Sequence, residues 1–432
     1  MKLSSSLLQL LKNKLLLSTF VYTLSTAFGA LVAFLLLPIL TKYLSQRDYG
    51  IVETFTAVSA CLAGIVLMGG QDLVAKEFFK LNSNDLKKRI GEQINVFWLG
   101  GIILIILLII INKYTNVTKN IIKLDSGLVL LAVGVSVANA AASLQNTIFQ
   151  LQKRMIHYSI FVNSKTLMNM IASIILIVVV GYAWEGRIIG IAGSSFLFLI
   201  VTLIILKRNG VLFSYPTKNT LILVAAGFPL MLAHITAWAM EMIDKIMINN
   251  FIGLEGTGLY SVGYRFGMIV MMIELSFSRA WLPFFYEKIQ SAEKNDKISI
   301  VKATYFYIIV LLIISLIIGI GGKYLLYLMV DETYYKADRF IFLISMSYFF
   351  DGIWKVFIVY LVHLNKVNIY SFIVGLSAII NILLNYVLLP KIGLIGAAWA
   401  TFISFAFGTI TTIIIAMRLY RMPWIQVFRK ML

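Results

Sequence analysis

The chain has 432 residues, of which 60% are hydrophobic and 13% are charged. An ordinary soluble domain has about 45–50% apolar and about 25% charged residues, so this composition excludes a soluble domain of the usual kind, and its low charge density excludes a disordered chain. The formal net charge is +18. Because the basic residues lie mostly between long apolar runs, they favour loops beside anionic lipid over nucleic-acid binding.

Twelve apolar stretches are long enough to cross a bilayer, for which a helix needs roughly 20 apolar residues. In chain order they are 16–40, 51–71, 94–112, 127–149, 159–182, 187–206, 221–244, 259–286, 303–321, 339–363, 370–389 and 394–416. The first stretch is too long for the apolar core of a signal peptide and lacks a small-residue cleavage site, so we expect a retained helix. The fold class is therefore an all-α polytopic membrane protein.

Lysine and arginine indicate the orientation of these spans. With a cytoplasmic N-terminus, 22 basic residues fall in cytoplasmic loops and 11 on the opposite side. An even number of spans then puts both termini in the cytoplasm. Residues 1–15 predict a cytoplasmic amphipathic segment. Residues 417–432 predict a cytoplasmic tail with Trp424 and Phe428 as interfacial anchors.

The two halves of the chain resemble each other in three ungapped segments. YSIFVNSKTLMNMIASIILIV matches YSFIVGLSAIINILLNYVLLP and pairs Asn169 with Asn381, KYLSQRDYGIV matches NFIGLEGTGLY, and GIAGSSF matches GAAWATF. We interpret the common order as a duplication, with six spans in each half. The prediction is a parallel repeat of two six-helix lobes, an architecture typical of transporters. The predicted N-terminal lobe, cytoplasmic linker and C-terminal lobe are 16–208, 209–220 and 221–416.

Polar residues inside the apolar stretches are the candidates for a functional site. An ionisable side chain at the bilayer centre costs at least about 2.5–3.5 kcal/mol, so each one needs a partner or a wet cavity. In the seventh stretch, His234, Trp238, Glu241 and Lys245 share one helical face, with Asp244 at its edge. The pattern favours a cavity-lining stripe, and Glu241 with Lys245 also fits an ion pair within the helix.

Three basic residues in other stretches are candidate ligands for phosphate. Arg265 and Arg279 are fourteen residues apart, which on one continuous helix gives a shared face and a separation of about 21 Å. The guanidinium fork suits phosphate oxygens, but snorkelling to the interface explains Arg279 equally well. Lys165 shares a side with Asn169 and Ser173 and has no acidic neighbour on its helix. It fits a cavity or a side chain that snorkels to the cytoplasmic face.

Several other residues have a candidate role with a structural alternative. Asp351 and Lys355 form an acid-before-base pair four residues apart, which predicts structural pairing. Arg47, in the short loop after the first stretch, fits a gate at the outer mouth or a solvated turn. Trp238 and Tyr264 are candidates for stacking on sugars. With three scattered histidines and one cysteine, Cys61, no metal site is predicted.

Two segments, MIDKIMINNFIGLEGTGLYSVGYRFG and NILLNYVLLPKIGLIGAAWATFISF, together with LPILTKYLSQRDYGIVETF, resemble a known family. They are similar to the polysaccharide flippases of the O-antigen and capsule type, within the multidrug/oligosaccharidyl-lipid/polysaccharide exporter superfamily. The resemblance implies a V-shaped pair of six-helix lobes with alternating access. It also implies a polyprenyl-pyrophosphate oligosaccharide substrate, moved from the cytoplasmic to the outer leaflet of a bacterial inner membrane. Drug-exporting relatives typically carry an acidic residue in the first span, and Leu15 to Thr41 has none.

The sequence thus predicts a flippase for lipopolysaccharide or capsule assembly, not an enzyme. Its partners would be the lipid-linked oligosaccharide, membrane lipids and other polysaccharide assembly proteins, with no nucleic acid. No cofactor is expected, and proton or sodium coupling stays open. The candidate substrate ligands are Arg265, Arg279, Lys245, Lys165, Trp238 and Tyr264. The candidates for coupling or gating are Glu241, Asp244, Asp351 and Arg47. The alternatives are a cation- or proton-coupled drug antiporter and, less favoured, a membrane-embedded glycosyltransferase or polymerase.

Overall fold

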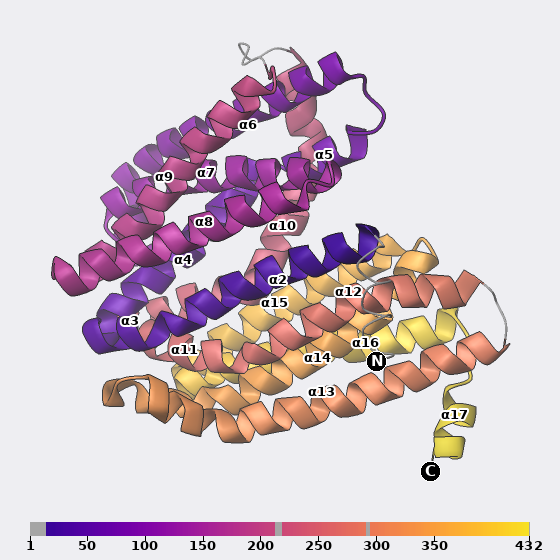
Figure 1. Cartoon of the computed structure of the whole chain (residues 1–432). Helices are drawn as coiled ribbons and strands as arrows, with labels where there is room; N and C mark the ends of the chain where they lie inside the picture. The colour runs from indigo at the N-terminus through magenta and orange to yellow at the C-terminus, as the bar shows by residue number, and fades with distance from the viewer. Residues whose placement is uncertain (1–13, 212–217, 291–293, 432) are drawn as a thin grey trace, which may run out of the picture. The chain divides into compact units, whose positions relative to one another are not determined.

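The computed structural model describes residues 14–211, 218–290 and 294–431, and these ranges are helical throughout, without strands (Figure 1). The chain divides into two compact units, Met1–Trp238 and Ala239–Leu432. The division falls within one helix, α10 (Lys218–Phe251), which contributes its first part to unit 1 and its second part to unit 2.

Unit 1 is built from helices joined by short turns. They are α2 (Lys14–Leu35), α3 (Leu37–Tyr43), α4 (Gln46–Leu67), α5 (Gly70–Glu77), α6 (Ser83–Thr115), the π-helical turn η1 (Thr118–Ile122), α7 (Ser126–Leu151), α8 (Met155–Ile174), the π-helical turn η2 (Ile175–Val179) and α9 (Trp184–Arg208). Side-chain caps fix where some of them begin. Ser45 and Asp48 form a capping box at the start of α4, and Asn82 accepts a hydrogen bond from the backbone of Asp85 in α6.

The core of unit 1 surrounds α7, which packs against α4, α6, α8 and α9. Small residues along α7 let its neighbours approach closely, as is usual for helices packed in a membrane. The Ser136 hydroxyl on α7 donates to the carbonyl of Ser59 on α4 at 2.8 Å. Helix α2 lies along α8, where the Ser25 hydroxyl donates to that of Ser159 at 2.7 Å. The buried residues of this core include Val66, Ile94, Phe97, Val137, Leu144, Ile148 and Leu199.

Unit 2 begins within α10 and continues through seven further described helices and one short turn. They are α11 (Leu254–Gly267), α12 (Ile269–Gln290), α13 (Lys294–Met329), the 3₁₀ turn η3 (Glu332–Ala337), α14 (Asp338–His363), α15 (Val367–Ile392), α16 (Leu394–Leu419) and α17 (Trp424–Met431). Helix α14 is the centre of this unit and packs against α11, α12, α13 and α16. At Gly408 on α16, a Cβ would lie 2.4 Å from the Trp354 ring on α14, so glycine allows this close approach.

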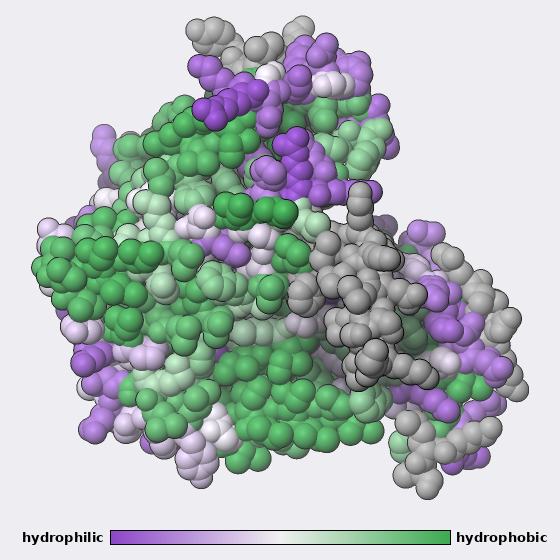
Figure 2. All heavy atoms as spheres, viewed as in Figure 1, coloured by the Kyte–Doolittle hydropathy of each residue, from purple (hydrophilic) through white to green (hydrophobic). Residues whose placement is uncertain are grey.

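The lengths of the helices confirm the predicted membrane protein. Ten described helices are long and apolar enough to cross a membrane, and the pair α11–α12 adds one more broken span. They coincide in order with the second to twelfth predicted stretches, and α2 with α3 occupies the first. Many of their outward side chains are apolar, such as Ile102, Ile106 and Ile109 on α6, and Figure 2 shows hydrophobic residues over much of the visible surface. Such a surface suits contact with lipid tails.

The eighth predicted stretch is not one continuous helix. Helix α11 ends at Gly267, α12 begins at Ile269, and the two are bent by 43°. A Cβ at Gly267 would lie 2.6 Å from the Cβ of Ile344, so glycine permits tight packing of α11 on α14 at the bend. The expected shared face of Arg265 and Arg279, at a separation of about 21 Å, assumed one continuous helix, and the two residues instead lie on different helices on either side of the bend.

The structure describes the predicted C-terminal tail but little of the predicted N-terminal segment. Most of the predicted amphipathic segment, 1–15, lies outside the described residues. In the C-terminal tail, α17 packs on unit 2 through Trp424, which is 8% exposed and stacks on Phe357 with 5.4 Å between ring centroids. Trp424 is therefore a packing residue and not an exposed anchor, whereas Phe428 is 50% exposed.

Candidate functional site

Unit 1 contains a polar pocket of about 430 Å³ lined by residues of α2, α7, α8 and α9. Its apolar wall comes mostly from α2 and α8. Its polar lining consists of Asn139, Ser143, Asn146, Lys165, Thr166, Asn169 and Arg187. Two of these described lining residues are cations, and none of them is acidic. We call this hollow the cationic pocket.

Lys165 lies near the middle of its span. It follows the first residue of α8, Met155, by ten positions, which is about 15 Å along the helix and about half the hydrocarbon thickness. Its ammonium donates to Asn139 Oδ1 on α7 at 2.6 Å, and the hydroxyl of Ser195 on α9 donates to the same oxygen at 3.2 Å. The side chain is thus directed across to α7 in the pocket, and not along α8 towards an end of the helix as snorkelling requires.

Arg187 is the second cation of the pocket. It lies in the first turn of α9, and its Nη1 donates to Asn169 Oδ1 and, at 2.7 Å, to Ser173 Oγ on α8. Close packing of α9 on α8 makes this reach possible, since a Cβ at Gly190 would lie 2.3 Å from Ser173 Oγ. In the sequence, Arg187 stands at the first position of the predicted stretch 187–206. The polar side of α8 predicted at Lys165, Asn169 and Ser173 is the surface to which it binds.

Three side chains that accept hydrogen bonds from these two cations are uncharged. Asn139, Asn169 and Ser173 stabilise the charges by hydrogen bonds but do not cancel them, as a carboxylate would. Two basic side chains in one hollow whose described lining has no carboxylate make that hollow electropositive. An anion in the cationic pocket would therefore gain Coulombic energy and charge-assisted hydrogen bonds together.

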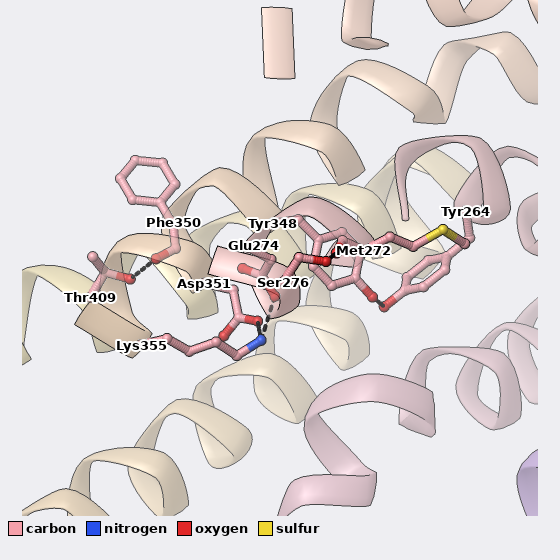
Figure 3. A network of polar contacts seen from close by, with 9 residues as sticks. All are labelled: Tyr264, Met272, Glu274, Ser276, Tyr348, Phe350, Asp351, Lys355 and Thr409. Carbon is pink, nitrogen blue, oxygen red and sulfur yellow. Dashed lines mark hydrogen bonds and ion pairs between the residues drawn. The ribbon is translucent and has the colours of Figure 1, made fainter. Parts of the chain in front are cut away.

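Unit 2 contains an ion-paired triad of a different kind. Lys355 donates to Asp351 Oδ2 at 2.7 Å and also to Glu274 Oε1 (Figure 3). The predicted pairing of Asp351 with Lys355 is confirmed. Glu274, on α12, is 0% exposed and was not predicted as a partner, because its helix is far away in sequence. Two carboxylates around one ammonium leave no spare positive charge here.

Asp244 lies in the core of unit 2 and not at the edge of an open stripe. Its side chain is 1% exposed. Its carboxylate accepts hydrogen bonds from Tyr260 Oη at 3.0 Å, Thr401 Oγ1 at 2.6 Å and Asn385 Nδ2 at 3.2 Å. These donors come from α11, α16 and α15, so Asp244 joins four helices. Its role in coupling stays a prediction.

The polar stripe predicted on α10 is divided between the two units. In unit 1, His234 Nε2 lies 3.0 Å from Asp72 Oδ2, and Trp238 Nε1 donates to the carbonyl of Ala57 at 2.9 Å. In unit 2, Glu241 is exposed, whereas Lys245 is 8% exposed. His234 and Trp238 therefore belong to unit 1, and Glu241 and Lys245 belong to unit 2.

Four of the candidate substrate ligands, Lys245, Tyr264, Arg265 and Arg279, lie in unit 2. Lys245 Nζ is 5.9 Å from the centroid of the Tyr264 ring, a cation–π distance. Tyr264 is 5% exposed, and its hydroxyl lies 2.8 Å from that of Tyr348, so its ring packs inside the unit (Figure 3). Arg265 and Arg279 are partly exposed on α11 and α12. Because Lys165 belongs to unit 1, one pyrophosphate site that uses all four basic residues stays a prediction.

Arg47 is exposed in the first turn of α4, beside the capping residue Asp48. That position fits the solvated turn at least as well as a gate. Among the described residues, no group of three or more His, Cys, Asp or Glu side chains is arranged to hold a metal ion.

Curated relatives of the chain are distant. A putative protein of the Lsg locus of Haemophilus influenzae is 20% identical over 62% of this chain and 65% of its own length. An uncharacterized membrane protein of the same organism is 23% identical over 64% of this chain and 66% of its own length. The matched region thus spans about two thirds of each relative.

Solved structures share the fold. An inward-facing multidrug resistance MATE family transporter of the MOP superfamily aligns with a TM-score of 0.69 at 13% identity, over 90% of this chain and 93% of that one. The lipid II flippase MurJ, in an inward closed conformation, aligns with a TM-score of 0.64 at 13% identity, over 92% of this chain and 87% of that one. These likenesses confirm the exporter-superfamily fold.

Family models assign the chain more closely. The MatE model matches residues 229–387. The model of the polysaccharide biosynthesis protein family matches residues 15–289, which is more than half of the chain. This match means that the chain belongs to the polysaccharide biosynthesis protein family.

Proposed function

We propose that the chain is an alternating-access flippase. It moves a polyprenyl-pyrophosphate-linked oligosaccharide from the cytoplasmic to the outer leaflet of a bacterial inner membrane for surface polysaccharide assembly. The observation that carries this proposal is the cationic pocket, where Lys165 and Arg187 line one hollow and the described lining has no carboxylate.

The chemistry of the pocket fits the polar end of such a lipid. Lysine and arginine bind pyrophosphate oxygens through charge-assisted hydrogen bonds. The amides of Asn139 and Asn146 and the hydroxyl of Ser143 supply donors and acceptors for sugar hydroxyls. A volume of about 430 Å³ lies in the range of ligand pockets. Flipping is slow without a protein because each polar group left unpaired in hydrocarbon costs several kcal/mol.

The membrane potential is a sufficient driving force for export. A pyrophosphate diester carries about two negative charges, and an interior-negative potential favours outward movement by roughly 2.3 kcal/mol per charge per 100 mV. Uniport therefore needs no coupling ion. Proton or sodium coupling through Glu241, Asp244 or Asp351 is the alternative energy source, and it predicts that flipping depends on an ion gradient.

A drug antiporter is the competing function, because the MatE model matches part of the chain and a multidrug transporter shares the fold. The cationic pocket argues against it, since two cations without a described carboxylate repel organic cations. Two carboxylates of unit 2 that such an antiporter could use, Glu274 and Asp351, are bound to Lys355.

Flipping in proteoliposomes tests the proposal. A labelled polyprenyl-pyrophosphate oligosaccharide would be placed in one leaflet, and its appearance in the other followed with and without an imposed potential. Lys165→Gln and Arg187→Gln are each expected to lower flipping at sub-saturating substrate by about 10–100-fold, because a hydrogen bond to a charged group contributes about 1.5–3 kcal/mol. Lys207→Gln, at an exposed position on α9, is the matched control.

Arg265→Gln in the same assay asks whether unit 2 also contributes to the substrate site, as the sequence predicts. Normal flipping by the double variant of Lys165 and Arg187 would overturn the assignment of the pocket. The absence of flipping by the wild type, together with proton-dependent uptake of organic cations, would establish the antiporter instead.

A further inference from the structure

Unit 1 carries a second hollow of about 400 Å³, which we call the apolar groove. It is bounded by α7, α8 and α9, and its lining consists of Phe149, His157, Ile160, Phe161, Ser164, Met168, Leu197, Phe198, Val201 and Ile205. Eight of these ten side chains are apolar, and none is acidic. Ile160 is 62% exposed and Met168 is 40% exposed, so the groove is open at the surface of the unit.

The apolar groove adjoins the cationic pocket. Phe161 lines both hollows, and its ring makes edge-to-face contacts with Phe149 and Phe198 at 6.0 and 5.0 Å between centroids. Helix α8 presents Ser164 to the groove and the next residue, Lys165, to the pocket. Since Phe161 and Lys165 are one turn apart, about 6 Å separates their positions along the helix.

This juxtaposition matches the lipid part of the proposed substrate. In a polyprenyl pyrophosphate, the anionic head is joined directly to a methyl-branched apolar chain, so a site for both needs an anion pocket and an apolar channel only a few bonds apart. We propose that the apolar groove binds the first isoprene units of the polyprenyl tail while the pyrophosphate occupies the cationic pocket. The proposal rests on the proposed function.

The properties of the groove favour the isoprenoid chain over an ordinary phospholipid acyl chain. Branched and aromatic side chains such as Val201, Ile205 and Phe198 make the surface of the groove uneven. The methyl branches of an isoprenoid chain fit between such side chains and pack closely against them. The groove is also continuous, through Phe161, with a pocket of opposite charge to pyrophosphate. Its open side lets the rest of a long tail stay in the hydrocarbon, so only the head and the first units are bound by the protein.

Photocrosslinking tests the occupant of the groove. A photoreactive phenylalanine analogue would replace Ile160 in the groove or, as a matched control, Leu107, which is 46% exposed on α6. The probe is a labelled polyprenyl pyrophosphate with one attached sugar, in vesicles of phosphatidylglycerol and phosphatidylethanolamine. We expect saturable labelling at Ile160, at least tenfold above Leu107, which unlabelled three-isoprene pyrophosphate abolishes. Equal labelling at both positions, or loss of labelling when the phosphatidylglycerol content is raised, would show that bulk lipid fills the groove.

A groove-filling variant separates this proposal from the proposed function. Ser164→Trp places a large ring in the groove, and Leu107→Trp is the control for a tryptophan at a lipid-facing position. Ser164→Trp is expected to lower flipping at least tenfold while the affinity for inorganic pyrophosphate, measured by calorimetry, stays within twofold of wild type. Normal flipping by Ser164→Trp would overturn the tail site and leave the flippase intact. A wild type that neither flips the lipid nor binds pyrophosphate would overturn the proposed function itself.

Discussion

Removal of the Lys355 ammonium is expected to destabilise unit 2 far more than removal of a carboxylate next to it. Lys355 donates to Asp351 at 2.7 Å and to Glu274, and the side chain of Glu274 is 0% exposed. In Lys355→Met, two carboxylates face each other without a counter-charge. In Glu274→Gln, the pair of Lys355 with Asp351 is intact, and the new amide still accepts a hydrogen bond.

The expected magnitudes follow from this asymmetry. Loss of one partner of a buried ion pair costs about 3–5 kcal/mol, because an uncompensated charge is left behind. The Lys355 side chain is 29% exposed, which puts the expected cost at the lower end of that range. For a unit of this size, about 3–5 kcal/mol corresponds to a fall in melting temperature of about 6–20 °C. Glu274→Gln is expected to change the melting temperature by less than half as much.

The assay is thermal unfolding of the purified protein in nanodiscs, followed by intrinsic fluorescence. Lys391→Met, at an exposed position near the end of α15, controls for the loss of a lysine. The double variant Lys355→Met, Glu274→Gln should recover part of the loss, because it removes one of the two opposed carboxylates. A melting temperature of Lys355→Met within 1 °C of that of Lys391→Met would refute the reasoning.

Four other substitutions have expected outcomes in the same unfolding assay. Asp244→Ala removes the acceptor of the buried Tyr260 hydroxyl and one of the acceptors of Thr401 and Asn385, and should cost about 1–3 kcal/mol; a neutral result would show that water replaces the carboxylate. Gly227→Ala puts a Cβ 1.9 Å from the backbone oxygen of Met68 and should cost at least about 1–3 kcal/mol, whereas Gly193→Ala, with no atom within 4 Å, should be neutral or stabilising. Ser45→Ala removes the cap of α4 and should cost about 0.5–2 kcal/mol, and no change would mean that the cap is redundant.

The membrane spans could be predicted from the sequence because one physical requirement dominates them. A helix satisfies its own backbone hydrogen bonds, so a run of apolar residues of sufficient length is by itself evidence for a span. The long stretches 303–321 and 394–416 illustrate this, since each lies inside one continuous helix, α13 or α16. The duplication of the spans stays a prediction, which rests on polar residues and glycines that recur at matched positions.

The break in the eighth stretch could not be predicted by the same means. Hydropathy is continuous from 259 to 286, and nothing in it marks the 43° bend. The bend accompanies a close contact of Gly267 with α14, more than 70 residues further along the chain. A glycine in a span was visible in the sequence, but the surface on which it packs was not.

Some residues of the candidate site could likewise be predicted from the sequence, and others could not. The polar side of α8 followed from helical periodicity, and Lys165 was found on it. Arg187 was missed because it precedes an apolar run and reads as a loop residue, although α9 begins at Trp184. Glu274 was missed as a partner of Lys355 because the sequence spacing of four residues identifies only pairs within one helix. Contacts across helices require the tertiary structure.

The predicted duplication places two different electrostatic environments at matched positions of the two halves. Asn139 and Asp351 are each the fourteenth residue of their helices, α7 and α14, which occupy the same place in the order of the two units. In unit 1 this position is an amide that accepts from Lys165, and in unit 2 it is a carboxylate that accepts from Lys355. A lysine already bound to two carboxylates offers little to an anion, because its charge is compensated. A lysine held by an amide keeps its charge, so the cationic pocket is where an anionic head group gains most from binding.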